Sequence, residues 1–220
     1  MYVLHSVSDW ASLCIHVALV EMDVPFTLHL HDYDAGTLNS PTFRAINPFG
    51  LLPALETPDG PMFETGAILL WLSERHGLAP TPLSRERAAF LKWFVFVNTS
   101  VHSTAVLLLH PERPAGDFAA VAVAQTAHTQ MQNHLAAIDT MIATEKPLWL
   151  SSAQPSVLSH YLGMLVRWVV AFPAHPDHAI NLATYPALEA VLTALESRPA
   201  VLKAAAAENL GPTIYTNIAA

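Results

Sequence analysis

The stretch from residue 47 to residue 68 constrains the fold of this chain more than any other. It begins with NPFGLLPAL at residues 47–55, where two prolines flank a glycine. That arrangement is typical of a rigid loop. After a Pro- and Gly-rich turn, ETGAI at residues 64–68 begins an apolar helical pattern. An oxygen-bearing side chain there can cap a helix, and the free N–H groups favour an anion. The sequence therefore predicts a rigid loop and an anion-attracting helix start, joined by a hairpin.

The first part of the chain predicts the element order β-α-β-α-β-β-α from its apolar periodicity. The predicted strands are residues 2–5, 26–31, 52–56 and 61–63, and the predicted helices are residues 10–22, 41–45 and 65–76. Gly77 is a typical helix stop. These elements predict an α/β N-terminal domain over residues 1–77.

The rest of the chain predicts helices only. Residues 78–84 contain two prolines and are interpreted as a linker. The predicted helices are residues 85–110, 117–144, 155–171, 185–196 and 199–208, with a break at residues 111–116. We therefore expect an all-helical domain over residues 85–220.

Composition and charge exclude several classes of function. Hydrophobic residues make up 52% of the chain and charged residues 13%, which is enough for a large core. The net charge of −8 argues against nucleic-acid binding. Cys14 is the single cysteine, so we expect a reducing, cytoplasmic location with no intramolecular disulfide and no secretion signal. The apolar run at residues 93–109 contains too many polar residues for a membrane span.

The loop and helix start resemble the glutathione S-transferase superfamily. The family pattern is N-P-x-G-x-[VL]-P-x-L, followed by an acidic residue, Ser or Thr, and then x-A-I. The resemblance continues to ESRPAVLKAAAAE at residues 196–208, which is similar to the family's ending. It implies a thioredoxin-like domain that binds glutathione, a helical domain that forms the electrophile site, and a homodimer.

The resemblance also implies how glutathione would be held. In the family, the proline equivalent to Pro53 follows a cis peptide bond, which costs about 0.5–1 kcal/mol before proline. The backbone of Leu52 would pair with the cysteinyl part of glutathione like an added strand. Glu64 suits the α-amino group of the γ-glutamyl end, and Thr65 at the helix start suits its α-carboxylate. An ordinary turn proline and a plain helix cap are the structural alternatives.

The reacting group would be the glutathione sulfur. Free thiols titrate near pH ~8.5, and the thiolate is the nucleophile. The protein must therefore lower the thiol pKa with a hydrogen-bond donor or with the start of the first helix. Four residues in or beside the turn after the first strand are candidate donors, namely Ser6, Ser8, Trp10 and Ser12.

A second resemblance helps to choose among these donors. WASLCIHVALVE at residues 10–21 is similar to the bacterial beta-class pattern GACSLxxHxxLxE. That register places Ala11 where beta-class enzymes carry their characteristic cysteine. We expect Ser12 to be the thiol-activating hydroxyl, with Ser8 second, and we assign Trp10 to the glutathione-binding set. Cys14 is interpreted as a packing residue.

A third resemblance lies on the predicted long helix. WFVFVNTSVHS at residues 93–103 is similar to the beta-class pattern WLxFxxxxLHK. His102 occupies the place of a histidine that faces the glutathione sulfur, and Ser103 replaces the adjacent lysine. Trp168 matches an aromatic residue that lines the same cleft, so we assign it, with His102, to the electrophile site. A hydrogen-bonded core histidine is the alternative for His102.

Two positions depart from the family. Leu51 stands where relatives often carry Lys or Gln, and it cannot donate a hydrogen bond to the glycine carboxylate of glutathione. Arg44 or a group from a partner subunit would have to substitute. In the helix-start motif at residues 155–159, Ser159 replaces an Asp, so we expect a weaker capping box with Ser156.

The twelve histidines show no strong metal-binding spacing. His29 and His31 share one face of a predicted strand, and His175 and His178 lie in a proline-rich loop. We interpret both pairs as surface histidines and predict no metal site.

The favoured function is a glutathione transferase that joins the glutathione thiolate to a hydrophobic electrophile, with glutathione as co-substrate. A glutathione-dependent disulfide reductase or peroxidase is the alternative among enzymes. A glutathione-binding scaffold without catalytic activity is the alternative outside enzymes. We expect neither nucleic acid nor membrane as a partner.

Overall fold

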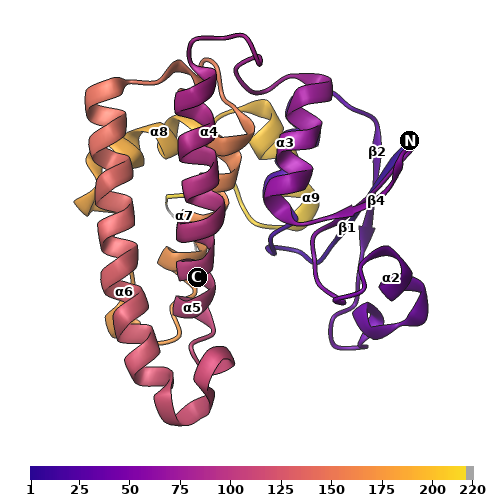
Figure 1. Cartoon of the computed structure of the whole chain (residues 1–220), viewed down its shortest axis with the longest axis horizontal. Helices are drawn as coiled ribbons and strands as arrows, with labels where there is room; N and C mark the ends of the chain where they lie inside the picture. The colour runs from indigo at the N-terminus through magenta and orange to yellow at the C-terminus, as the bar shows by residue number, and fades with distance from the viewer. Residues whose placement is uncertain (217–220) are drawn as a thin grey trace.

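The structure is a computed structural model that describes residues 1–216, apart from the side chain of Ala115. Residues 217–220 of the predicted helical domain lie outside the described residues. A sheet-containing N-terminal part lies beside a larger helical part (Figure 1). This arrangement confirms the predicted fold class.

The N-terminal part is built on a four-stranded mixed sheet. Its strands are β1 (Tyr2–Ser6), β2 (Phe26–Leu30), β3 (Ala54–Thr57) and β4 (Gly60–Phe63), in the order β2-β1-β3-β4. β1 runs parallel to β2, where His5 pairs with His29, and antiparallel to β3, where His5 pairs with Ala54. The β3–β4 hairpin pairs Ala54 with Phe63. All four predicted strands are present, with ends shifted by at most two residues.

Helices cover the two faces of the sheet unequally. α1 (Leu13–Glu21) and α3 (Thr65–His76) pack with Leu4 and Leu55 into the main core. The other face carries the short helix α2 (Pro41–Ile46), which follows a 3-10 turn η1 (Thr37–Asn39). There, Phe43 and Ala54 form a small separate cluster. Figure 1 shows α2 and α3 on opposite sides of the strands.

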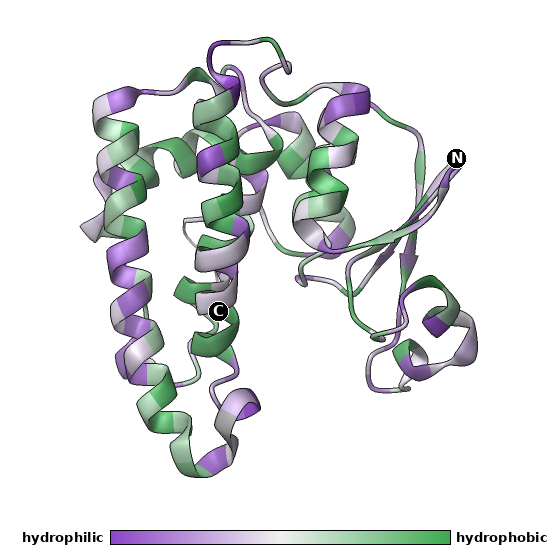
Figure 2. Ribbon diagram, in the orientation of Figure 1, coloured by the Kyte–Doolittle hydropathy of each residue, from purple (hydrophilic) through white to green (hydrophobic). Residues whose placement is uncertain are grey.

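The helical part consists of long helices joined by short turns. Its helices are α4 (Arg87–Phe96), η2 (Val97–Val101), α5 (His102–Leu109), α6 (Glu112–Glu145), α7 (Val157–Ala171), α8 (Pro186–Glu196) and α9 (Pro199–Glu208), with 3-10 turns η3 (Leu148–Leu150), η4 (Pro176–His178) and η5 (Leu182–Thr184). Figure 1 shows α6 alongside α4 and α5. Figure 2 shows hydrophobic residues concentrated on α4, α5 and α7, and many hydrophilic residues along α6. No helix in the described part of the chain is both long and apolar enough to cross a membrane.

Two details refine the predicted helices. The helix predicted at residues 85–110 is continuous from α4 to α5, but η2 in its middle has π-helical geometry. α6 is interrupted at Gly116, whose φ of 67° and ψ of 178° are not helical, which accounts for the predicted break. A π segment inside an α-helix is often found at a functional site.

The capping box at the start of α7 has both of its hydrogen bonds, with Ser159 in the place of the family's Asp. The N–H of Leu158 donates to the Ser156 hydroxyl, and the Ser159 hydroxyl accepts from the N–H of Ser156 at 3.1 Å. A serine hydroxyl therefore makes the contact expected of an Asp carboxylate. The box fixes the start of α7, which packs against α1 and joins the two parts of the molecule.

Candidate active site between the sheet and the helices

The rigid loop before β3 has the predicted form. The peptide bond between Leu52 and Pro53 is cis. Asn47 is buried, and its Nδ2 donates to the carbonyl of Leu51 at 2.7 Å while its Oδ1 accepts from the N–H of Phe49 at 3.1 Å. Because β3 begins only at Ala54, the backbone of Leu52 lies outside the ladder of the sheet. The loop thus presents a free stretch of backbone at the end of a strand.

The start of α3 lies beside this loop. Ala54 pairs with Phe63, so the residues next in register, Pro53 and Glu64, face each other at the same end of the hairpin. Glu64 has a φ of 75°, which is uncommon for a residue with a side chain, and its exposed carboxylate does not cap the helix. Thr65 is buried at the first position of α3. A carboxylate and the free N–H groups of a helix start are therefore brought together.

The π segment of the long helix touches the start of α3. A Cβ added to Gly66 would lie 2.3 Å from Oδ1 of Asn98, so only glycine allows this approach. The Tyr161 hydroxyl on α7 donates to the same Oδ1 at 3.0 Å and lies 2.5 Å from Nδ1 of His102. A chain of polar groups therefore runs from α3 to His102.

This chain determines the hydrogen-bonding role of His102. Burial raises the pKa of Tyr161, so the side chain stays a neutral phenol. Its hydroxyl donates a hydrogen bond to Oδ1 of Asn98. The Nδ1–H of His102 must then donate to Tyr161, which leaves the lone pair of His102 on Nε2. Burial lowers the pKa of His102 to about 4, so the ring is neutral at neutral pH. The ring of Trp168 lies 5.7 Å from that of His102, which brings together the two residues assigned to the electrophile site.

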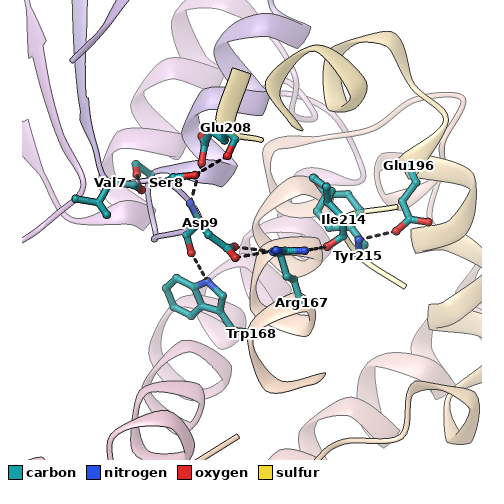
Figure 3. Close-up of polar contacts among 10 residues, drawn as sticks. Val7, Ser8, Asp9, Arg167, Trp168, Glu196, Glu208, Ile214 and Tyr215 are labelled. Atoms are coloured by element: carbon teal, nitrogen blue, oxygen red, sulfur yellow. Dashed lines mark hydrogen bonds and ion pairs between the residues drawn. The ribbon is translucent and has the colours of Figure 1, made fainter. Parts of the chain in front are cut away.

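The turn after β1 is fixed by the helical part (Figure 3). Ser8 donates its hydroxyl proton to the carbonyl of Glu208 at 2.7 Å, and the N–H of Asp9 donates to the Glu208 carboxylate at 2.9 Å. The carboxylate of Asp9 accepts two hydrogen bonds from Arg167. The indole N–H of Trp168 donates to the carbonyl of Asp9 at 3.0 Å. Three residues from two distant segments, Arg167, Trp168 and Glu208, thus hold the turn in one conformation.

Ser12 lies below the surface rather than at it. It is fully buried at the start of α1, and its hydroxyl is 2.6 Å from that of Ser6, which is also buried. Neither hydroxyl faces solvent in this conformation. Ser8 is exposed, but its proton is engaged with Glu208. The turn therefore presents no free hydroxyl donor among the three serines considered.

The remaining predicted residues occupy structural positions. The ring of Trp10 lies 4.8 Å from that of Tyr33, beside the small cluster on the α2 face. Cys14 is fully buried, and burial raises the pKa of its thiol, in agreement with a packing role. The guanidinium of Arg44 donates to the carbonyl of Pro48 at 2.8 Å and so supports the loop. Leu51 is exposed, with an apolar side chain.

His31 is half-buried and belongs to a cluster of three histidine rings. Nε2 of His31 lies 2.9 Å from Nδ1 of the buried His5, and exposed His29 stands beside both rings. Because β1 and β2 run parallel, His5 and His29 are partners on one face of the sheet. His178 is buried, with its ring centroid 5.6 Å from that of His175, so its interpretation as a surface histidine is wrong. Strand pairing, which spacing along the chain does not reveal, brings the first three histidines together.

The mixed sheet, the cis proline before β3 and the adjoining helical part define the class of the protein as a glutathione transferase fold. A family model for the glutathione S-transferase N-terminal domain matches residues 1–74. Glutathione S-transferase GstA of Escherichia coli O157:H7 is 27% identical over 205 residues, which cover 90% of this chain and 94% of that protein.

Two solved structures extend the similarity to nearly the whole chain. A sphingomonad glutathione S-transferase complexed with glutathione is 30% identical with a TM-score of 0.74, covering 95% of this chain and 100% of that one. A beta-class glutathione S-transferase of Sphingomonas chungbukensis is 27% identical with a TM-score of 0.76 and the same coverage. The chain therefore belongs to the glutathione S-transferase superfamily, and its similarity to bacterial beta-class members confirms the resemblance seen in its motifs.

Sequence reasoning missed the residues that organise the site. Asp9, Arg167 and Glu208 hold the turn, and Asn98 and Tyr161 orient His102. Asn98 could have been noticed as a polar residue inside an apolar helical pattern. The others have no local signal, because their partners lie more than 50 residues away in the chain.

Proposed function

We propose that the protein is a glutathione transferase that conjugates the glutathione thiolate to a hydrophobic electrophile. One observation carries the proposal: the hairpin register puts Pro53 opposite Glu64, so the free backbone at Leu52 lies beside the start of α3. An extended peptide with a charged amino-acid end fits this pairing of strand-like backbone, carboxylate and helix start. Glutathione is such a peptide.

In the proposed complex, the cysteinyl part of glutathione pairs with the backbone of Leu52. The γ-glutamyl end lies at the start of α3, where Glu64 accepts from its α-amino group. The Thr65 hydroxyl and the N–H groups of the first turn donate to its α-carboxylate. The side chain of Leu51 supplies no donor for the glycine carboxylate, and the nearby cation is Arg44 of α2, which donates to the carbonyl of Pro48 in the loop. Trp10 lies in the turn beside the ligand.

Thiolate formation is proposed to depend on His102 and on the turn after β1. The thiol proton would pass to Nε2 of His102, whose other nitrogen is engaged by Tyr161. A thiolate held nearby raises the pKa of His102, because an opposite charge favours the imidazolium. Ser8 and Ser12 remain candidate donors to the sulfur, and each would need a hydrogen-bond rearrangement to reach it.

The electrophile is proposed to bind between the two parts of the chain, beside His102 and Trp168. We further propose a domain boundary at residues 78–84, a cytoplasmic location and a homodimer. Large apolar side chains on the loop and on α4 support the dimer, since Phe49 is 64% exposed, Leu51 61% and Val95 54%. Sedimentation of the dilute protein at twice the monomer mass of 23.9 kDa supports this state, and sedimentation at the monomer mass rules it out.

One observation favours the scaffold alternative. The serine that best matches a thiol-activating position, Ser12, is buried against Ser6. A protein that binds glutathione without activating it would have such a turn. A reductase that forms a mixed disulfide on the protein is disfavoured, because Cys14 is fully buried.

An assay panel separates these functions. The wild-type protein is tested with glutathione and a chloronitrobenzene, and in parallel with glutathione and a small disulfide. Turnover of the chloronitrobenzene supports the transferase, and turnover of the disulfide alone supports the reductase. Glutathione binding with neither turnover supports the scaffold.

A further inference from the structure

Three histidines meet on the sheet face that carries α2, away from His102. Their nearest ring nitrogens all lie within 4.8 Å of one another. Phe43 of α2 packs over two of them, with its ring 5.5 Å from that of His5 and 4.7 Å from that of His31. We propose that His5, His29 and His31 bind one divalent transition-metal ion, with Zn²⁺ as the expected ion.

Hydrogen bonds fix the ring nitrogen that His5 has available. Its Nε2 lies 3.0 Å from the carboxylate of Glu56, which only accepts, so Nε2 carries the proton. In the neutral ring, the lone pair is therefore on Nδ1. A carboxylate behind a histidine is the usual outer-shell partner of a metal-binding imidazole, because it fixes the ring and makes it a better ligand.

The same reasoning applies to His31. The Thr37 hydroxyl donates its own proton to the carbonyl of Asp32 at 2.8 Å, so it accepts from Nδ1 of His31, which lies 3.3 Å away. The lone pair of neutral His31 is then on Nε2.

These assignments leave two lone pairs facing each other. Nδ1 of His5 and Nε2 of His31 are only 2.9 Å apart, and without a cation between them they repel. Two imidazole nitrogens bonded to one tetrahedral Zn²⁺ at about 2.0–2.1 Å lie about 3.3 Å apart. The two rings therefore need to separate by only about 0.4 Å to share one ion.

His29 supplies the third ligand. Its ring lies 5.0 Å from that of His5 and 4.6 Å from that of His31, and its side chain is exposed and can rotate toward them. Imidazole ligands suit Zn²⁺, Cu²⁺ and Ni²⁺. Three histidines leave one coordination position of a tetrahedral ion for water or another small ligand.

The test is a calorimetric titration of chelator-treated, dialysed full-length protein with Zn²⁺. Glutathione is left out, because its own thiolate binds metal. A parallel titration with Co²⁺, followed by visible absorption, reports the coordination geometry. The proposal predicts one tight site per chain and a tetrahedral Co²⁺ spectrum.

Variants locate the site. Loss of an outer-shell partner typically weakens metal binding by about 10–100-fold, and loss of a ligand should cost at least as much. We therefore expect His29→Ala to weaken Zn²⁺ binding at least about 10–100-fold and Glu56→Gln to weaken it about 10-fold. Since His29 is exposed, its replacement leaves the fold intact. His31→Ala gives an independent second test. His175 is an exposed histidine beside His178, far from the proposed ligands in the sequence, and His175→Ala is the matched control. This variant should bind Zn²⁺ like the wild type.

Three results would overturn the proposal. The first is no Zn²⁺ binding by the wild-type protein, which would mean that a shared proton occupies the gap between the rings. The second is undiminished binding in both His29→Ala and His31→Ala. The third is loss of the site in His175→Ala. None of these results affects the proposed glutathione site, which is tested separately.

Discussion

Asp9 and Arg167 form a two-point ion pair between the turn after β1 and helix α7. Oδ1 of Asp9 lies 2.6 Å from Nε of Arg167, and Oδ2 lies 2.7 Å from Nη2. The Arg167 side chain is 5% exposed and that of Asp9 18%. The pair therefore links the turn beside the proposed thiol site to the helix that carries Tyr161.

Breaking this pair should destabilise the fold. Asp9→Asn leaves the buried Arg167 charge without its partner, which typically costs about 3–5 kcal/mol. We expect a loss of this size in the free energy of unfolding, measured by urea denaturation. The surface pair of Asp59 and Arg75 is the control, because both side chains are at least half exposed. Asp59→Asn should cost about 0–1 kcal/mol. Equal losses in the two variants would contradict the buried role of the Asp9 pair.

The contact between α3 and the π segment gives a second prediction. Gly66→Ala places a methyl group 2.3 Å from Oδ1 of Asn98, so the two helices must move apart. Overpacking of this kind costs about 1–3 kcal/mol, and Asn98→Ala in the same chain should restore part of the loss. The control is Ala67→Ser at the neighbouring exposed residue, whose free energy of unfolding should stay within about 0.5 kcal/mol of the wild-type value. Thermal unfolding is measured for the wild type, the two single variants and the double variant. A stability of Gly66→Ala equal to that of the wild type would show that α3 and the π segment are not tightly packed at this contact.

Replacement of the candidate thiol-activating residues separates their roles. The neutral ring of His102 can accept the thiol proton, whereas the hydroxyl of Ser12 is hydrogen-bonded to the hydroxyl of Ser6. We expect His102→Ala to lower kcat by about 100-fold, the low end for a general base, and to reduce the ultraviolet absorption of bound thiolate. Ser12→Ala should leave that absorption unchanged and cost about 1 kcal/mol of stability. The opposite pattern would make Ser12 the activating residue.

Buried neutral histidines make stability depend on pH. His160 is fully buried, and its ring nitrogens have no hydrogen-bond partner in the described part of the chain. Burial lowers its pKa from 6.5 to about 4. At pH values between these two, the unfolded chain binds a proton at this histidine that the native protein does not bind. The free energy of unfolding therefore falls as the pH falls from 6.5 toward 4.

The size of this effect can be measured with one variant. A single histidine contributes a slope of at most about 1.4 kcal/mol per pH unit. His160→Leu should flatten the pH dependence by up to that amount, as followed by urea denaturation at a series of pH values. An identical slope in wild type and His160→Leu would show that His160 titrates normally.

The sequence predicted the parts of the site that lie within one short segment. NPFGLLPAL and ETGAI are each local, so they predict the rigid loop and the helix start, while the cis proline is what the family resemblance implies. The order of elements was foreseen too, because strand alternation and helical periodicity are local patterns. At the start of α7, the hydroxyl of Ser159 accepts the hydrogen bond that the family's Asp would accept.

What the sequence did not reveal depends on distant pairing. The burial of Ser12 follows from its contact with Ser6, and the histidine cluster requires β1 and β2 to pair in one particular register. The Asp9 pair with Arg167 joins residues 158 positions apart. No spacing rule connects such residues, so only the folded chain brings them together.

The most direct test of the account is calorimetric titration of the wild-type protein with glutathione, compared with the Glu64→Ala/Thr65→Ala double variant. Each lost hydrogen bond to a charged group of the ligand is worth about 1.5–3 kcal/mol, or roughly a 10-fold or greater loss of affinity. We expect one glutathione to bind per chain at millimolar concentration or below, and binding to be weakened at least about 100-fold in the variant. Absence of binding by the wild type at millimolar glutathione, or equal affinities of the two proteins, would contradict it.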